Sequence, residues 1–314
     1  MKKFTKNIMI FSLPVLMLLV LTELSLRIIP NDYSFKRDYL DKYSNKISVL
    51  FLGNSHVYFG IKPELLEAKS FNAAHISQSL DYDFEILKKY ENNWSNLKYI
   101  ILPVDYFSLY GSLTDGSEEW RVKNYKIYYG VSTRDKFNDN FELLNGKFGK
   151  NINRAFKYWT KNRNDLACDK LGWGTSYNSA NNQDLLETGK SAALRHTSAK
   201  GTVLPVQVSA LNKILSFAKT KNIKVILFIS PAYKTYVENL KPQQLAKTIG
   251  VLNQLKEQNK GLEYYNFIND KSFVAKDFYD GDHLNEIGAK KFSLKMDSIV
   301  KFQNKALIAK VKKE

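Results

Sequence analysis

The chain has 314 residues, enough for one large domain or two small ones, and 44% of them are hydrophobic, which supports a sizeable core and argues against disorder. The single cysteine, Cys168, excludes an intramolecular disulfide and is interpreted as structural. The formal net charge of +16 leaves three interpretations open: attraction to anionic lipid head groups, attraction to an acidic glycan, or a lysine-rich composition without a specific partner.

Residues 1–30 have the pattern of a membrane anchor. Three lysines among the first six residues precede an uncharged run over 7–22, and apolar residues continue to Ile29, so the segment reaches the length of about 20 that a spanning helix needs. Glu23 and Arg27 are four apart and are expected to pair near the membrane surface. No small-residue cleavage site follows, which favours an uncleaved signal anchor over a removable signal peptide. The alternative is a buried amphipathic helix.

The position of the lysines predicts the orientation of the anchor. Because positive charges stay on the cytoplasmic side, we expect a single-pass protein whose remaining chain is extracytoplasmic, in the periplasm or at the cell surface. Residues 31–46 are polar and of mixed charge, and are predicted to be a linker between membrane and domain.

A buried strand is predicted at residues 47–52, which are mostly apolar and rich in Val, Leu and Phe. It ends at the turn pair Gly53–Asn54, and Ser55 follows immediately. A serine at the C-terminal edge of a buried strand lies where open α/β sheets bind their ligands. Taken alone, the stretch is equally compatible with an ordinary loop serine.

Further strands and helices alternate along the chain. The other strands are expected at residues 70–74, 97–104, 222–230 and 262–267. Helices are expected from 62, through 84–90, and over 205–221 and 239–260. This alternation predicts an α/β domain over residues 47–300, with a three-layer α/β/α, flavodoxin-like architecture and a parallel five-stranded sheet. We find no internal repeat, glycine-rich phosphate loop or metal-ligand spacing.

The parallel-sheet pattern breaks between about residues 111 and 200. The segment is rich in Asn, Lys and aromatic residues, and 141–162 has the pattern of a basic amphipathic helix. We interpret it as an inserted cap over the active-site end of the sheet. Aromatic residues among polar ones suit sugar stacking, and packing within a subdomain explains them equally well. For His196, near the end of the cap, we favour a structural role over the alternative that it approaches the active site.

Residues 277–292 form a second stretch that contains candidate catalytic residues. Asp280 and His283 are three apart around a glycine, and Asn285 follows as a candidate N-cap of a helix. A serine hydroxyl is a weak nucleophile until a base takes its proton, and a carboxylate commonly orients that base. The hypothesis is therefore that Ser55 is the nucleophile, His283 the general base and then acid, and Asp280 the group that orients the imidazole.

The segments Gly53-Asn54-Ser55-His56 and Asp280 to His283 resemble the serine block and the Asp-x-x-His block of the SGNH (GDSL-like) hydrolase superfamily. The resemblance spans about residues 47 to 296, with a loose match in the middle. The apolar N-terminal segment ending in Glu23-Leu-Ser-Leu-Arg27 is similar to that of membrane-tethered members, and the chain resembles the membrane-associated branch that O-acylates glycans.

The resemblance implies that backbone N–H groups hold the oxyanion. The candidates are Ser55 itself and a residue in the stretch from Ala74 to Ser77, and Asn54 is a further oxyanion or substrate-binding candidate. Typical members carry Gly-x-Asn-Asp after the third strand, with the asparagine donating to the oxyanion. This chain has Asp105 in that neighbourhood and no such asparagine. Since an ionised carboxylate cannot donate a hydrogen bond, that role is not transferred.

Tyr233, which follows the strand at 222–230, is expected to contact substrate. The resemblance implies serine-dependent ester chemistry on a cell-surface polysaccharide or other glycan, with O-acyl (acetyl) transfer favoured. The alternatives are an extracytoplasmic carbohydrate esterase and a non-catalytic glycan-binding or assembly component. The missing asparagine favours the non-catalytic alternative, and the complete Ser/Asp/His set favours an enzyme.

The expected partners are the membrane, the glycan, an acyl donor and a multi-pass membrane acyltransferase. No metal or organic cofactor is implied. No nucleic acid is expected, because an exported, anchored domain does not ordinarily meet any. Residues 301–314, which include several lysines, are predicted to form a basic tail.

Overall fold

The computed structural model describes residues 2–145 and 148–311. Its centre is a five-stranded sheet of order β2-β1-β3-β4-β5 in which each neighbouring pair is parallel, so the predicted sheet is confirmed. The strands are β1 Val49–Phe51, β2 Ser70–Asn72, β3 Tyr99–Pro103, β4 Lys224–Ile229 and β5 Glu263–Asn266.

The central strands are buried on both faces, as expected for a parallel sheet between two helical layers. Alternate residues enter two separate cores: Leu50, Ile100 and Leu227 face one, while Phe51, Ile101 and Phe228 face the other. This is the two-residue period of strand side chains.

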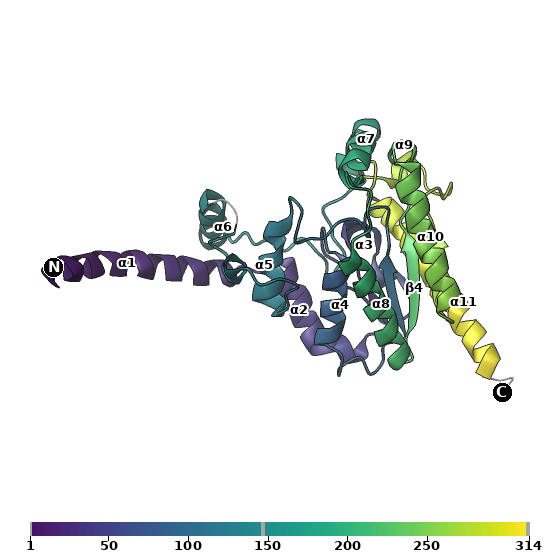
Figure 1. The fold of residues 1–314 in the computed structure, drawn as a ribbon, viewed down its shortest axis with the longest axis horizontal. Helices are drawn as coiled ribbons and strands as arrows, with labels where there is room; N and C mark the ends of the chain where they lie inside the picture. Colours follow the sequence, from purple (N-terminus) through teal and green to yellow (C-terminus); the bar gives the residue numbers. More distant parts are fainter. Residues whose placement is uncertain (1, 146–147, 312–314) are drawn as a thin grey trace.

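Helices complete each core, and the predicted three-layer arrangement is confirmed (Figure 1). The first core includes residues of α2 Asp32–Tyr43, α4 Leu80–Lys89, α8 Pro205–Thr220 and α10 Pro242–Gln258. The second includes residues of α3 Ser55–Gly60 and α11 Glu286–Val311. Two short segments belong to the remaining connections: η2 Pro63–Leu65, where a longer helix from residue 62 was predicted, and η7 Ala275–Asp277.

Residues 31–46 differ from the predicted linker, because they fold onto the domain. Asn31 caps α2 by accepting hydrogen bonds from the backbone N–H groups of Tyr33 and Ser34. Tyr33 and Leu40 are buried, and Lys36 is buried between them with its amine donating to the carbonyl of Ala74. Burial lowers the pKa of Lys36 to about 8. The helix was not predicted because its buried face includes a lysine, so the segment lacks a continuous apolar face.

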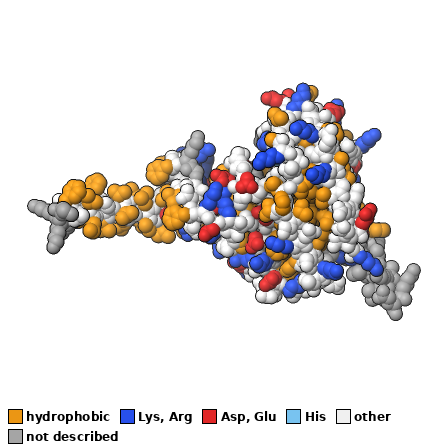
Figure 2. Space-filling view, viewed as in Figure 1, with side chains coloured by type: hydrophobic (Ala, Val, Ile, Leu, Met, Phe, Trp, Pro, Cys, Tyr) orange, Lys and Arg blue, Asp and Glu red, His pale blue; other side chains and the backbone are white. Residues whose placement is uncertain are grey.

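The N-terminal helix α1 Lys2–Arg27 projects from the domain (Figure 1). Most of its apolar side chains are exposed (Figure 2). The stretch Asn7–Arg27 is long and apolar enough for a membrane anchor or a signal sequence. The predicted pair is present, with Arg27 Nε 2.7 Å from Glu23 Oε1. The Glu23 carboxylate also accepts the backbone N–H groups of Glu142 and Leu143, each at 3.0 Å. The domain end of α1 is therefore held by the inserted segment.

The segment between residues 111 and 200 is built of helices, turns and loops. Its elements are η3 Glu119–Arg121, α5 Val122–Asn124, η4 Tyr125–Tyr129, η5 Phe137–Asn140, α6 Phe148–Lys161, η6 Ser179–Asn181 and α7 Leu185–His196. The amphipathic helix expected within 141–162 is α6. At the other end of the chain, the predicted basic tail continues α11 as far as Val311, and its last three positions lie outside the described residues.

Candidate active site

Ser55 lies at the carboxyl end of β1, where the chain turns into α3. Gly53 has a φ of +116°, and a Cβ there would come within 2.3 Å of the Pro103 ring, so both conformation and space favour glycine. Asn54 caps α3 by accepting the backbone N–H of His56 at 2.9 Å. Ser55 is thus the first helical residue, and its Oγ lies 2.8 Å from His283 Nε2.

A short loop before α11 presents His283 with Asp280. The Asp280 Oδ1 accepts hydrogen bonds from the backbone N–H of His283 at 2.8 Å and from that of Asp282 at 3.1 Å. The same oxygen lies 3.0 Å from His283 Nδ1. The predicted proximity of Ser55, His283 and Asp280 is therefore found, across 228 positions of sequence between serine and histidine.

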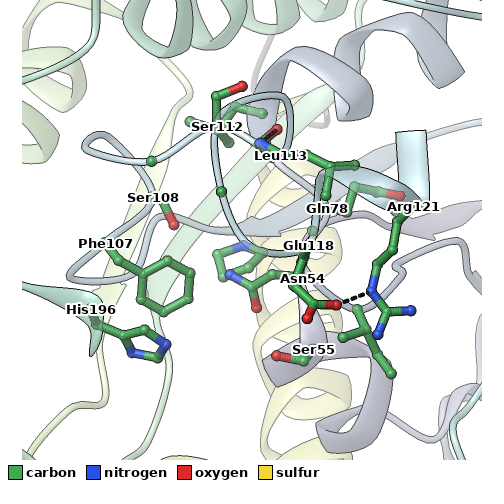
Figure 3. Close-up of a pocket in the computed structure, with 18 of the residues that line it drawn as sticks. Asn54, Ser55, Gln78, Phe107, Ser108, Ser112, Leu113, Glu118, Arg121 and His196 are labelled. Atoms are coloured by element: carbon green, nitrogen blue, oxygen red, sulfur yellow. Dashed lines mark hydrogen bonds and ion pairs between the residues drawn. The ribbon is translucent and has the colours of Figure 1, made fainter. Parts of the chain in front are cut away.

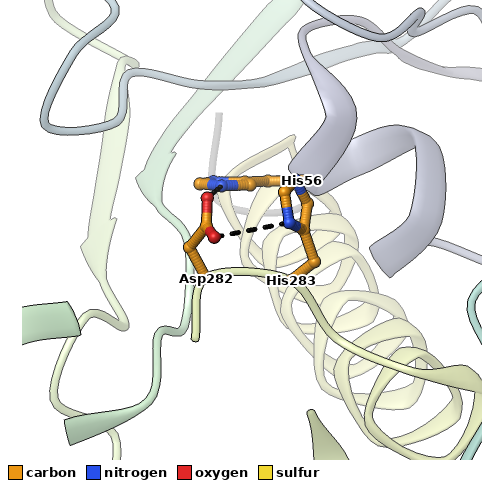
Figure 4. A group of neighbouring side chains, drawn as sticks. All are labelled: His56, Asp282 and His283. Atoms are coloured by element: carbon orange, nitrogen blue, oxygen red, sulfur yellow. Dashed lines mark hydrogen bonds and ion pairs between the residues drawn. The ribbon is translucent and has the colours of Figure 1, made fainter. Parts of the chain in front are cut away.

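Asp282 adds a second carboxylate beside His283 that the sequence analysis missed. It is 2% exposed, and its oxygens lie 3.5 Å from His283 Nδ1 and 3.4 Å from His56 Nε2 (Figure 4). Burial opposes ionisation of Asp282, but the surrounding imidazoles hold its pKa well below the usual range. Burial disfavours the charged form of His283, but Asp282 and Asp280 together raise its pKa. The Asp-Gly-Asp-His spacing was the available signal.

His56 extends this network under the serine. Its Nδ1 lies 2.9 Å from Asp105 Oδ2, and the opposite ring nitrogen faces Asp282. Burial alone would lower the pKa of His56, but Asp105 and Asp282 outweigh it and raise the pKa to about 10. Asp105 also accepts Asn54 Nδ2 at 3.0 Å and the backbone N–H of Ser230 at 2.8 Å. The pKa of Asp105 is lowered: burial opposes ionisation, and the His56 charge outweighs it.

Asp105 consequently connects the ends of β3, β4 and α3 rather than facing a reacting group. Asn54, predicted as an oxyanion or substrate-binding residue, lines the cavity described below. However, its carboxamide is engaged by His56 and Asp105. The side chain of Asn54 therefore positions Ser55 and its neighbours.

The structure excludes one of the predicted oxyanion residues, Ala74, and leaves another, Ser77, as a candidate. The expectation for Ala74 is wrong, because its backbone N–H donates to Asn72 Oδ1 at 3.1 Å and it is absent from the cavity lining. Ser77 lies in the cavity wall with a φ of +61°. Within the described chain, the backbone N–H groups of Ser55, Ile76 and Ser77, next to the cavity, have no acceptor. These groups remain the candidates for holding an oxyanion.

Tyr233 is not among the residues that line the cavity, so its predicted substrate contact finds no support there. It occupies the N-cap position of α9 Lys234–Glu238. Its backbone N–H donates to the carbonyl of Gly281 at 3.0 Å, and its ring lies 5.7 Å from that of Phe278. Tyr233 therefore supports the loop that carries Asp280 and His283.

A cavity of about 460 Å³ opens beside Ser55 and His283. The inserted segment supplies much of its wall, including Tyr177. Leu113 and Arg121 of this segment and Phe107, which follows β3, are seen in Figure 3. Arg121 pairs with Glu118 at 2.5 Å within this wall. The cavity combines aromatic faces, hydroxyl groups and arginines next to the serine.

His196 was expected to be structural, but it lines the cavity. Its Nδ1 lies 2.9 Å from the Tyr236 hydroxyl and 3.8 Å from Asp282, and its ring centroid is 4.1 Å from that of Phe107. Burial lowers its pKa to about 3, so His196 is neutral at ordinary pH. A neutral imidazole can both donate and accept hydrogen bonds beside the reacting groups.

His56, Asp282 and His283 also lie close enough to be considered as metal ligands, with candidate atoms within 4.8 Å of one another. Their ring nitrogens face the serine hydroxyl or carboxylates at hydrogen-bonding distances. The hydrogen-bonded network thus accounts for the cluster as it stands.

Comparison with known proteins gave one matching family and several similar solved structures. The model of the family described as "Protein of unknown function (DUF1574)" matches residues 121–300, more than half of the chain. No curated protein matches the chain. A Bacteroides fragilis protein described as a "putative acylhydrolase" is 15% identical, with a TM-score of 0.38, 86% of this chain covered and 95% of that chain. A Streptococcus pneumoniae protein described as a "putative platelet activating factor" is 13% identical, with a TM-score of 0.39, 90% of this chain covered and 97% of that chain.

Proposed function

The chain belongs to the DUF1574 family of proteins of unknown function, and from the geometry of its site we propose that it is a serine-dependent acyl-transferring enzyme. The observation that carries the proposal is the hydrogen-bonded series of Ser55 Oγ, His283 Nε2 at 2.8 Å, and Asp280 at 3.0 Å from His283 Nδ1. This constellation activates a hydroxyl that is otherwise a weak nucleophile.

In the proposed reaction, neutral His283 removes the proton of Ser55 as Oγ attacks the carbonyl carbon of an acyl donor. The resulting oxyanion accepts hydrogen bonds from the backbone N–H of Ser55 and from that of Ile76 or Ser77. His283 then protonates the leaving group, and acyl-Ser55 remains. An acceptor hydroxyl gives its proton to His283, attacks the ester, and leaves as the new ester while Ser55 recovers its proton. Asp280 holds the imidazole in orientation throughout.

We propose a hydroxyl of a cell-surface glycan as the acceptor. Aromatic faces of Phe107 and Tyr177 and polar side chains such as Gln78 and Ser112 line the cavity, a combination that suits a sugar ring. The apolar α1 would keep the domain beside a membrane, where a multi-pass acyltransferase could deliver the acyl donor. The same residues would support hydrolysis if water reached acyl-Ser55 first, so the acceptor distinguishes a transferase from an esterase.

The test follows an isotopically labelled acyl group from an activated ester, with and without the cell's own polysaccharide. We expect label on the polysaccharide and a transient acyl group on Ser55, detected by mass spectrometry of the peptide. Ser55→Ala should lower transfer by about a thousandfold or more. Ser298→Ala, on the outer side of α11, is the matched control and should leave transfer unchanged.

Two results would contradict the proposal. Label released as free acid at the same rate with or without polysaccharide would make the protein an esterase. No turnover and no acyl-serine under either condition would indicate a non-catalytic glycan-binding or assembly component.

A further inference from the structure

Exposed apolar side chains outside α1 concentrate near the domain end of that helix. Five of the six exposed Phe and Trp side chains outside α1 lie between residues 120 and 159 in the described chain. They are Trp120, Phe137, Phe148, Phe156 and Trp159. Soluble surfaces do not ordinarily gather large aromatic residues in this way, so the region has the composition of a contact surface.

Helix α6 organises part of this surface. At 3.6 residues per turn, its apolar residues fall within an arc of about 100°. They are Phe148, Ile152, Ala155, Phe156 and Trp159. Lys150, Lys157 and Lys161 are exposed and lie on the opposite side of the helix. The apolar side chains remain outside the domain core, since Phe156 is 57% and Trp159 63% exposed.

The helix lies against α1 at the end of the apolar run. Trp159 Nε1 donates to Ser25 Oγ at 2.6 Å, and Leu21 and Thr22 share a groove with Ile152 and Phe156. This level of α1 is also where Glu23 and Arg27 introduce charge. Hydrophobic side chains are visible both along α1 and where it meets the domain (Figure 2).

We propose that α6 is an in-plane membrane helix whose apolar face enters the interface of the bilayer that α1 spans. The proposal rests on α1 being a membrane anchor and does not depend on the chemistry of Ser55. Three observations favour a bilayer as the partner of this face. The apolar face is continuous with the exposed surface of α1, and it lies beside the part of α1 where Glu23 and Arg27 end the uncharged run. In addition, Trp159 is a residue type enriched at membrane interfaces. The lysines on the opposite side would remain in water.

This arrangement would fix the domain relative to the membrane at two places. The Glu23 carboxylate already binds the backbone at Glu142 and Leu143, a few residues before α6. With α6 also in the interface, the domain could not swing freely about the end of α1. The cavity beside Ser55 would then open at a constant height and angle above the lipid.

The experiment compares two adjacent positions on α6 in the full-length chain. Single cysteines replace Phe156 on the apolar face and Lys157 on the opposite side, in a Cys168→Ser background, and each carries an environment-sensitive fluorophore. The proteins are inserted in nanodiscs of equal parts phosphatidylglycerol and phosphatidylcholine. Quenching is measured with lipids spin-labelled near the head group and with iodide in water.

We expect spin-labelled lipid to quench the label at position 156 about three times more strongly than that at position 157, with the opposite order for iodide. A label at Phe148, two turns earlier on the same face, provides an independent measurement if the change at 156 disturbs the fold. Equal access of iodide to all three positions would overturn the proposal. Disulfide cross-linking of unlabelled Phe156→Cys between two copies, regardless of lipid, would instead make this face an interface between copies of the chain.

Discussion

At the scale of single residues, the site depends on how three carboxylates share two protonatable rings. Asp280 binds His283 directly, Asp105 binds His56, and Asp282 lies between the two imidazoles. Each ring is buried, and a buried imidazolium is tolerated only with such partners. The carboxylates therefore control both the basicity of His283 and the stability of the structure beneath Ser55.

The pH dependence of activity tests the effect of Asp282 on His283. His283 must be neutral to accept the Ser55 proton, so activity should rise with pH through a pKa that lies above 6.5. Replacing Asp282 with Asn removes a negative charge that favours the imidazolium, so the pKa of His283 should fall. The acid limb of the kcat/KM profile, measured with an activated acyl ester, should move to lower pH. Asp38→Asn, on the exposed face of α2, should leave the limb in place, and an upward shift in Asp282→Asn would contradict this role.

The buried His56 predicts a particular dependence of stability on pH. Its pKa is raised from 6.5 to about 10, so the stabilisation is complete below pH 6.5 and is lost as pH rises through about 10. His56→Gln leaves Asp105 and Asp282 without their partner and should cost about 3 kcal/mol of unfolding free energy near neutral pH. Denaturant titrations should show this cost shrinking towards about pH 10.

His75→Gln is the matched control for that measurement. His75 is also buried, but burial and the nearby Lys36 and Arg121 lower its pKa well below the usual value. It is therefore neutral in both folded and unfolded chains above about pH 7. Its replacement should lower the unfolding free energy by the same amount near neutral pH and near pH 10. A cost for His56→Gln that is constant with pH would show that His56 is not charged in the folded protein.

At the scale of elements, two glycines allow the histidine loop to approach α7. A Cβ on Gly281 would lie 2.2 Å from Gly189 Cα and 2.4 Å from its nitrogen. These are backbone atoms of a helix, so a side-chain rotation could not relieve the clash. The position of Asp280 and His283 therefore depends on the absence of a side chain between their loop and α7.

Gly281→Ala should displace the loop from α7 and separate His283 from Ser55. We expect a lower melting temperature together with loss of acyl-serine formation. Gly250→Ala is the control, because a Cβ at that site in α10 would meet no described atom within 4 Å. There, alanine should stabilise the protein by about 1 kcal/mol through its better helix propensity. Normal acyl-serine formation in Gly281→Ala would show that the loop tolerates a wider spacing.

At the scale of the whole molecule, the domain end of α1 is bound to the inserted segment. If a peptidase removed the N-terminus near Asn31, the backbone N–H groups of Glu142 and Leu143 would lose the Glu23 carboxylate, and Trp159 would lose Ser25. The contacts therefore favour an anchor that is retained over a signal sequence that is removed.

We accordingly expect the full-length protein to fractionate with membranes, and a reporter fused after residue 314 to be active outside the cytoplasm. Alkaline phosphatase activity and its cytoplasmic counterpart, β-galactosidase, provide complementary readouts. Release of a soluble form beginning near Asn31 would identify α1 as a cleaved signal, and activity of the cytoplasmic reporter would reverse the orientation.

The sequence by itself determined the features whose chemistry is local. The apolar run of α1, the strand leading to Ser55, the Asp280–His283 spacing and the alternation of strands and helices each depend on nearby residues. The parallel direction of the strands followed because helices between successive strands provide the crossover connections that a parallel sheet requires. These patterns were sufficient to bring Ser55 and His283 to one edge of the sheet.

The tertiary structure decided what depends on distant partners. Residues 31–46 become a helix because the domain buries Tyr33 and Leu40, and the N–H of Ala74 is unavailable because Asn72 accepts it. His56 acquires its charge from Asp105 and Asp282, which are 49 and 226 positions away along the chain. Burial and electrostatic pairing act between residues that are distant in the sequence, so they cannot be predicted from residue type and local spacing alone.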